Sequence, residues 1–364
     1  QKNILLLQSI KVLIFNIYFF MKKYFLYSIA SIGTVLLATA CQENTKKETA
    51  PANNLSLNQS TSDHFTLTGK APQQGQVVLY QYKDRTYTPV DSTTIQNGVF
   101  QFQGKLSEPL VYAIRLNGKG PRIHFYLENA PLQVTLNPDW GVEHLSSTEN
   151  TQWFHRYNTL AENNMLDLQQ EIKEAPASPA LAYFLARLAY QYDYPTLVEL
   201  RKALDPALNN NPYLQELDAS LELLSKVQPG AQAPDITLED AQGKNISLSQ
   251  LRGKLVLVDF WATWCPDCRK VIPELKALYD TYKDKDFTIL SASYDHDRNA
   301  WKQFIQKEQL LWHHGIAPGD WKSDAGRTYA IRWLPTAILI GKDGRILARS
   351  TKLSDLTPII KENL

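Results

Sequence analysis

The order of hydrophobic and polar positions divides the chain into parts of different secondary structure. Between residues 65 and 136, short segments in which apolar and polar residues alternate are separated by turn signals such as Asn97-Gly98 and Asn117-Gly118. Alternation with a period of two is typical of half-buried strands, and Asn-Gly pairs favour hairpins. The pattern predicts a small all-β domain at 63–140, most simply a sandwich. The expected strands are 65–68, 76–80, 99–102, 111–116, 123–127 and 132–136.

Residues 141–227 change to a helical period and predict a helical connector. Leu181, Phe184, Leu185 and Leu188 follow i, i+3, i+4, i+7 spacing, and a similar leucine series occupies 214–224. Such helices have an apolar face that must be covered. They can pack on a neighbouring domain or form a dimer seam, and their short length favours packing within the chain.

Residues 228–364 show a third pattern, in which strands and helices alternate. The apolar runs at 254–260 and 287–293 are typical of buried central strands. Further expected elements are hairpins at 235–248 and 336–348 and helices at 268–282, 298–308 and 354–363. The order predicts an α/β domain with a mixed sheet.

The N-terminal region has the features of an export signal. Met21-Lys22-Lys23 precedes an apolar run at 24–40, which predicts a signal peptide at 21–40 after an upstream extension at 1–20. The stretch 37–41 resembles a bacterial lipoprotein box ending at Cys41, although Ala38 stands where a larger aliphatic residue is common. We expect lipid attachment at Cys41, a flexible tether at 41–62, and a membrane-anchored protein of the bacterial envelope that faces the periplasm or the cell surface. A signal cut elsewhere and an uncleaved anchor remain alternatives.

Composition and charge narrow the function classes. The 364 residues include 38 Lys and Arg against 37 Asp and Glu, so the formal charge is +1. This near balance excludes a nucleic-acid protein held by bulk charge. Only three cysteines are present, which excludes a disulfide-rich scaffold and leaves one cysteine outside any pair.

Two of these cysteines form the motif that carries chemistry, Cys265-Pro266-Asp267-Cys268, directly after the central strand. Cysteines three residues apart at a helix start can close a disulfide with little chain movement. Pro266 is tolerated in the first helical turn, and the helix dipole there lowers the pKa of the Cys265 thiol. We expect Cys265 to attack and the more buried Cys268 to resolve.

The region around this motif resembles the TlpA and ResA-like thiol-disulfide oxidoreductases of the thioredoxin superfamily. The resemblance rests on Ala233-Pro234, on 248–253, on 258–268 and on Leu334-Pro335-Thr336, and it covers about 228–364. It implies a thioredoxin fold and a cis-proline at Pro335 that lies against the active cysteines. It also implies that Asp259 assists proton transfer at Cys268. The β domain resembles domains that precede such regions in Bacteroidetes-type envelope proteins.

Other uses of the cysteine pair remain open. A zinc site needs two more ligands, for which His313-His314 would have to serve. A structural disulfide is disfavoured by its place on a strand-to-helix turn beside Trp264. A peroxidase of the AhpC/TSA type would carry proline and threonine where Val258 and Ala262 stand.

These patterns together predict an envelope oxidoreductase that reduces disulfides of substrate proteins. We expect catalysis by Cys265, Cys268, Asp259 and Pro335, and substrate contacts from Trp264, Pro266 and Leu334. The expected partners are a protein with a disulfide and a membrane or periplasmic reductant; no metal, cofactor or nucleic acid is expected. Asp267 should make the couple more reducing, because its charge opposes thiolate formation at Cys265. The alternative from another class is a partner-binding lipoprotein in which the redox site is subsidiary.

Overall fold

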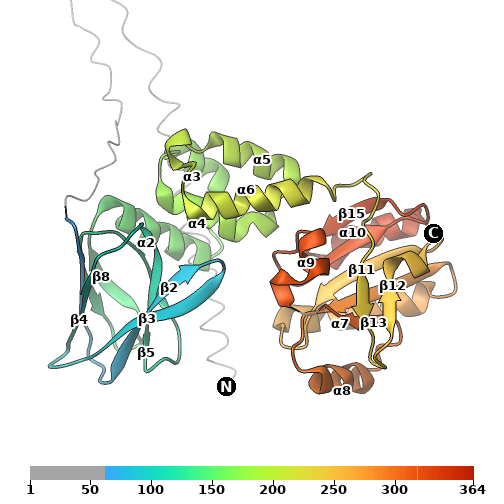
Figure 1. Ribbon diagram of the computed structural model, residues 1–364, viewed down its shortest axis with the longest axis horizontal. Coiled ribbons are helices and arrows are strands. Elements are labelled where there is room, and N and C mark those ends of the chain that lie inside the picture. The colour runs from blue at the N-terminus through green and yellow to red at the C-terminus, as the bar shows by residue number, and fades with distance from the viewer. Residues whose placement is uncertain (1–61, 318) are drawn as a thin grey trace, which may run out of the picture. The chain divides into compact units, whose positions relative to one another are not determined.

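The computed structural model describes residues 62–317 and 319–364, which belong to one compact unit (Figure 1). The predicted upstream extension, signal peptide and Cys41 lie outside these residues, as does all of the tether except its last residue. Within the described residues the buried apolar side chains form two clusters, one from Phe65 to Leu217 and one from Val227 to Ile360. None of the helices in the described ranges is long and apolar enough to cross a membrane.

The first cluster contains a β-sandwich. Its two four-stranded sheets have the orders β4-β1-β7-β8 and β3-β2-β5-β6. The strands are β1 (Phe65–Lys70), β2 (Gln76–Lys83), β3 (Thr86–Thr94), β4 (Val99–Gly104), β5 (Leu110–Leu116), β6 (Ile123–Leu127), β7 (Pro131–Leu136) and β8 (Val142–Ser146). All six predicted strands are present.

Two strands of the sandwich were not predicted from the sequence. β3 is exposed along most of its length and contains Pro89, and β8 is short and largely polar. Neither has the alternation that marks a half-buried strand. Their partners β2 and β7 supply the backbone hydrogen bonds instead.

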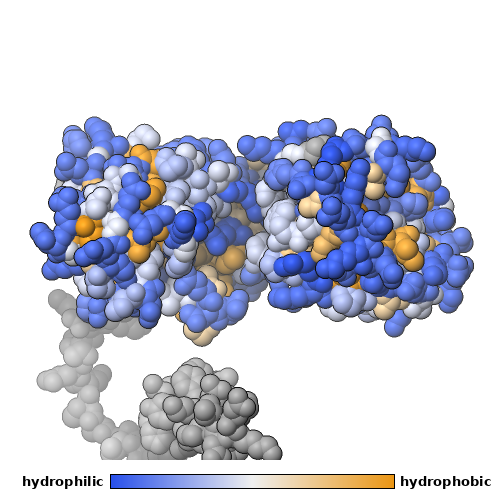
Figure 2. Space-filling view, turned by 90° about the horizontal axis from the view of Figure 1, so that it is seen from below, coloured by the Kyte–Doolittle hydropathy of each residue, from blue (hydrophilic) through white to orange (hydrophobic). Residues whose placement is uncertain are grey.

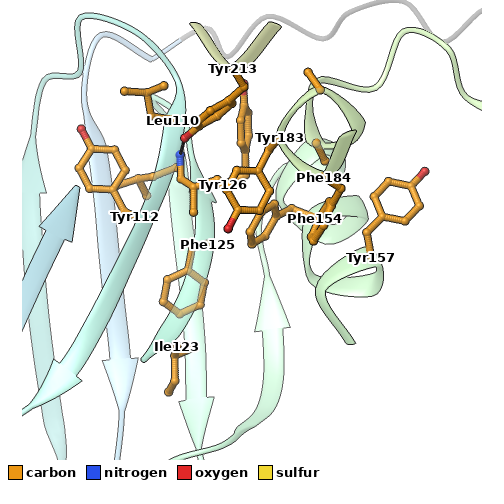
Figure 3. Packing of buried hydrophobic residues seen from close by; sticks show 14 of the residues in the cluster. Leu110, Tyr112, Ile123, Phe125, Tyr126, Phe154, Tyr157, Tyr183, Phe184 and Tyr213 are labelled. Carbon is orange, nitrogen blue, oxygen red and sulfur yellow. Dashed lines mark hydrogen bonds between the residues drawn. The ribbon is translucent and has the colours of Figure 1, made fainter. Parts of the chain in front are cut away.

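Five helices complete the first cluster and pack on the sandwich. They are α2 (Glu149–Glu162), α3 (Leu168–Glu174), α4 (Pro179–Leu188), α5 (Tyr194–Ala203) and α6 (Pro212–Ser225). Figure 3 shows aromatic rings from strands and helices meeting in one core. The Tyr213 hydroxyl accepts a hydrogen bond from the backbone amide of Val111 at 2.7 Å and donates one to the carbonyl of Tyr82 at 3.2 Å. The apolar helix faces are thus covered within the chain, as their short length favoured.

The second cluster has a thioredoxin-like fold. Its seven-stranded mixed sheet has the order β10-β9-β13-β12-β11-β14-β15, in which β11, β12 and β13 run parallel. The strands are β9 (Thr237–Glu239), β10 (Asn245–Ser247), β11 (Leu255–Trp261), β12 (Phe287–Ser293), β13 (His313–Ile316), β14 (Thr336–Ile340) and β15 (Ile346–Ser350). The helices are α7 (Pro266–Tyr282), α8 (Arg298–Glu308), α9 (Asp324–Thr328) and α10 (Leu353–Glu362). Helix α7 packs against β12, and α10 packs against β14 and β15.

The surface in Figure 2 is mostly hydrophilic, with small and scattered hydrophobic spots. Trp264 and Trp333 are among the large hydrophobic residues that remain exposed. Both belong to the loops that carry the cysteine motif and Pro335. Exposed aromatic side chains thus lie on both loops that border the cysteine motif.

Candidate active site

The cysteine pair lies where β11 ends and α7 begins. Cys265 is the N-cap of α7, and the backbone amide of Cys268 donates a hydrogen bond to its Sγ at 3.2 Å. Pro266 occupies the first turn, where its missing amide hydrogen has no helical partner to lose. The two cysteines form a disulfide with Cα atoms 5.3 Å apart. The positive end of the α7 dipole therefore acts on the Cys265 sulfur.

Both sulfur-bearing residues lie just below the surface. Cys265 is 5% exposed and Cys268 is 3% exposed, so Cys268 is only slightly more buried than Cys265. Trp264 beside them is 52% exposed, and Pro266 is exposed as well. Asp267 points to solvent and forms an ion pair with Lys270 at 2.7 Å. That lysine offsets part of the negative charge that Asp267 adds near the pair.

The loop before β14 forms the other side of the site. The peptide bond between Leu334 and Pro335 is cis, as the resemblance implied. The carbonyl oxygen of Leu334 lies 3.8 Å from the Sγ of Cys265. Thr336 steadies this loop, because its hydroxyl donates a hydrogen bond to the carbonyl of Trp333 at 2.7 Å. Segments 69 residues apart in sequence thus meet at Cys265.

Asp259 is buried on β11 beneath the cysteine pair. The Ser291 hydroxyl donates a hydrogen bond to its carboxylate at 3.0 Å, and the Trp312 indole donates one to Ser291 at 2.9 Å. Burial raises the pKa of Asp259 to about 7, although the Ser291 hydrogen bond opposes this shift. Asp259, Cys268 and Pro335 line one cavity of about 10 Å³. A carboxyl with this pKa can take up or release a proton near neutral pH.

A second buried acid holds the loop before the motif. Both the amide and the hydroxyl of Thr263 donate hydrogen bonds to the carboxylate of Asp295, at 2.9 and 2.5 Å. Ser293 donates a further hydrogen bond to Asp295 at 2.6 Å. Asp295, Ser291 and Trp312 were not predicted from the sequence. Their only sequence signal is position, since Ser291 lies within a strand parallel to the one that ends at the motif and Asp295 just follows that strand.

The two histidines considered for zinc lie elsewhere in the sheet. His313 and His314 are on β13, which is separated from β11 by β12. The ring of His314 packs against Trp312 and Trp261. Across residues 62–317 and 319–364, no group of three or more His, Cys, Asp or Glu side chains is arranged to hold a metal ion.

A dithiol-disulfide pair at a helix start beside a cis-proline, on a thioredoxin-like sheet, defines a thiol-disulfide oxidoreductase site. Residues 229–349 match the AhpC/TSA family, and residues 65–150 match a domain of unknown function (DUF4369).

Individual relatives give the family. The chain is 36% identical over 124 residues to thiol-disulfide oxidoreductase ResA of a Bacillus cereus strain, which covers 34% of this chain and 70% of that protein. The ResA of Bacillus subtilis (strain 168) is 31% identical over 121 residues, with 33% and 66% covered. The thioredoxin domain of a thiol-disulfide oxidoreductase from Bacteroides vulgatus is 36% identical, with 37% of this chain and 96% of that chain covered and a TM-score of 0.35. The chain belongs to the ResA-like thiol-disulfide oxidoreductases.

Proposed function

We propose that this oxidoreductase reduces disulfide bonds of substrate proteins through Cys265 and Cys268. The observation that carries the proposal is the disulfide between these residues at the N-terminus of α7, beside the cis bond before Pro335. A pair that closes within one helical turn can alternate between dithiol and disulfide without rearranging the sheet. A purely structural disulfide would need neither a helix dipole at its sulfur nor exposed aromatic neighbours.

The reaction is an exchange of disulfides in two steps. In the reduced protein the Cys265 thiolate attacks one sulfur of the substrate disulfide, which forms a mixed disulfide and releases the other substrate sulfur as a thiolate that takes up a proton. The Cys268 thiolate then attacks the Sγ of Cys265 and releases the second substrate sulfur. Two electrons pass from the protein dithiol to the substrate. A membrane or periplasmic dithiol reductant returns them.

Asp259 serves the second step in this proposal. The thiol of Cys268 must lose a proton before it attacks, and Asp259 is the buried group that shares its cavity. A cavity of about 10 Å³ is close to the smallest that holds one water molecule. One water there would connect the carboxylate with the Cys268 sulfur. The raised pKa of Asp259 suits such a proton acceptor near neutral pH.

The substrate is an extended segment that lies across the two loops. Trp264 and Pro266 are exposed on the motif side, and the carbonyl of Leu334 faces Cys265 from the other side. The Leu334 side chain itself is 6% exposed, so this residue would contact the substrate through its backbone. The assignment of these residues as substrate contacts rests on their position around the sulfur.

We place the reaction in the bacterial envelope, with the protein anchored through a lipid on Cys41. This part of the proposal rests on the sequence pattern at 21–41, which lies outside the described residues. Mass spectrometry of the protein purified from its host membrane should find an acylated Cys41. A free thiol at that position would remove the anchor and leave the redox site untouched.

The central experiment traps the mixed disulfide. In cells that carry Cys268→Ser, Cys265 should remain joined to a substrate protein that mass spectrometry identifies after release by dithiothreitol. The matched control is Cys265→Ser/Cys268→Ser, which should trap nothing. If the single variant traps no more protein than the double variant while Cys265 is in its thiol form, disulfide reduction of proteins is the wrong function.

A further inference from the structure

A hollow of about 590 Å³ is lined by a set of tyrosine and arginine side chains, and Arg332 and Trp333 of the loop before Pro335 also line it. Its wall includes Tyr82, Tyr87, Tyr183 and Tyr213, from β2, β3, α4 and α6. Tyr183 is buried between the sheet and the helices, and its hydroxyl is drawn in Figure 3. Hollows of roughly 300–1,000 Å³ with aromatic walls and a few fixed polar groups are typical of small-molecule sites.

The charge of this hollow is positive. Arg85, Arg122, Arg187 and Arg332 line it, against the carboxylates of Glu162 and Glu216. Glu216 is bound to Arg332 at 2.5 Å, and Glu162 is exposed to solvent. In the described part of the chain, Arg85, Arg122 and Arg187 have no carboxylate at ion-pair distance.

Aromatic residues hold these guanidinium groups instead, and Arg85 lies over the ring of Trp321 at 4.8 Å. Arg122 lies over the ring of Tyr87 at 4.2 Å, and Arg187 donates a hydrogen bond to the Tyr183 hydroxyl at 2.6 Å. These contacts orient the cations without neutralising them. The Nε of Arg122 is buried and has no hydrogen-bond partner among the described residues. An oriented donor without an acceptor is what an anionic ligand would satisfy.

The positive charge around the hollow also acts on His124 of β6. Its Nε2 is 2.7 Å from the Tyr87 hydroxyl, and its Nδ1 is buried without a hydrogen-bond partner in the described chain. Burial lowers the pKa of His124, and together with the positive charges of Arg187 and Arg122 it brings this pKa to about 4. An anion placed between these groups would oppose that effect.

We propose that this hollow binds a carboxylate carried on a flat apolar group. The guanidinium groups of Arg122 and Arg187 would hold the carboxylate, because planar guanidinium and carboxylate groups form paired hydrogen bonds. The tyrosine rings would cover the apolar part. The ligand is a free aromatic acid or the C-terminal carboxylate of a polypeptide that ends in an aromatic residue.

Calorimetric titration of the full chain with benzoate tests the site, with benzamide as the neutral probe of the same shape. Benzoate should bind saturably and more tightly than benzamide. Loss of a hydrogen bond to a charged group costs about 1.5–3 kcal/mol, so Arg187→Gln and Arg122→Gln should each weaken benzoate by about tenfold or more. Lys119→Gln removes one exposed positive charge from a nearby loop and should leave the affinity unchanged.

A measurement on the unaltered protein keeps the test independent of variant folding. The pKa of His124, followed by NMR, should rise when benzoate is saturating and stay constant with benzamide. Equal affinities for the two probes, an unmoved His124 pKa, or an affinity that survives both arginine substitutions would each overturn the proposal. A peptide that ends in phenylalanine with a free carboxylate, compared with the same peptide as its amide, distinguishes a polypeptide terminus from a small aromatic acid. Tighter binding of the free peptide than of benzoate assigns a polypeptide terminus, and weaker binding assigns a small acid.

Discussion

The two hydrophobic clusters of this chain differ in the hydrogen-bond partners that they give to buried polar groups. In the thioredoxin-like cluster, buried acids such as Asp259 and Asp295 lie on or just after central strands and accept hydrogen bonds from neighbouring hydroxyl groups. In the first cluster the hydroxyls of Tyr213 and Tyr183 bond to backbone groups and to Arg187 beside an open hollow. The first arrangement positions a covalent reaction at a fixed sulfur. The second leaves charged donors unpaired, which suits reversible binding.

The largest effect should come from the attacking sulfur. Cys265→Ser should lower the rate of disulfide reduction by about 10³-fold or more, because loss of a covalent nucleophile leaves only binding and orientation. Turnover of a fluorescent disulfide peptide measures it. Binding of benzoate in the hollow should be unchanged, because neither cysteine lines it, and a parallel loss of both would show that the two sites are coupled.

The next effect concerns the stability of the first cluster. Phe154 is fully buried against Tyr126, Tyr183 and Phe184, so Phe154→Ala should cost about 3–5 kcal/mol of unfolding free energy there. Hydrogen exchange should accelerate for amides of β5 and β6 and stay slow for those of β11 and β12. Equal acceleration in both sheets would mean that the clusters unfold as one unit.

The stability of the thioredoxin-like cluster should depend on pH because of Asp259. Its pKa is raised to about 7 when folded, so the folded state binds the proton more tightly than the unfolded state. The contribution to stability is fully present below the unfolded pKa of about 4 and is lost as the pH rises to about 7, by up to about 4 kcal/mol. Urea unfolding between pH 4 and 8 should show this fall, and Asp259→Asn should remove it.

Asp259→Asn also tests whether this residue transfers a proton during the reaction, which the stability measurement does not show. In the unaltered protein, resolution of the mixed disulfide should quicken as the pH rises through about 7, because ionised Asp259 then accepts the Cys268 proton. Asp259→Asn should flatten that profile and slow resolution by about 10²-fold or more. Asp280→Asn, which changes an exposed acid at the other end of α7, serves as the control. An unchanged profile in Asp259→Asn would take this residue out of the reaction.

The smallest effect is expected at Asp267. Removing its charge should lower the pKa of the Cys265 thiol only slightly, since the ion pair with Lys270 already offsets part of that charge. Thiolate absorbance followed against pH in Asp267→Asn measures the change. A thiol pKa that stays constant or rises would contradict the proposed role of this acid in tuning the couple.

An element could be predicted from the sequence where its own residues carry the pattern that marks it. The continuous apolar run at 254–260, the helix at 298–308 and the hairpin at 336–348 were all predicted, because each shows its own period or turn residues. The cysteine pair was visible for the same reason, since both sulfurs and the helix start lie within four residues. The polar strand β3 was missed, because its pairing with β2 and not its own pattern makes it a strand.

Tertiary structure decided what lies beside these local units. It brought Leu334 to Cys265, gave Asp259 its Ser291 partner and gave Ser291 its Trp312 partner, contacts that span 69, 32 and 21 residues of sequence. It also gathered Arg122 and Arg187 around one hollow, although nothing near either residue in sequence marks a site. Hydrogen bonds and burial act through space, so residues from separate elements become a site only when packing sets their distance and removes their water.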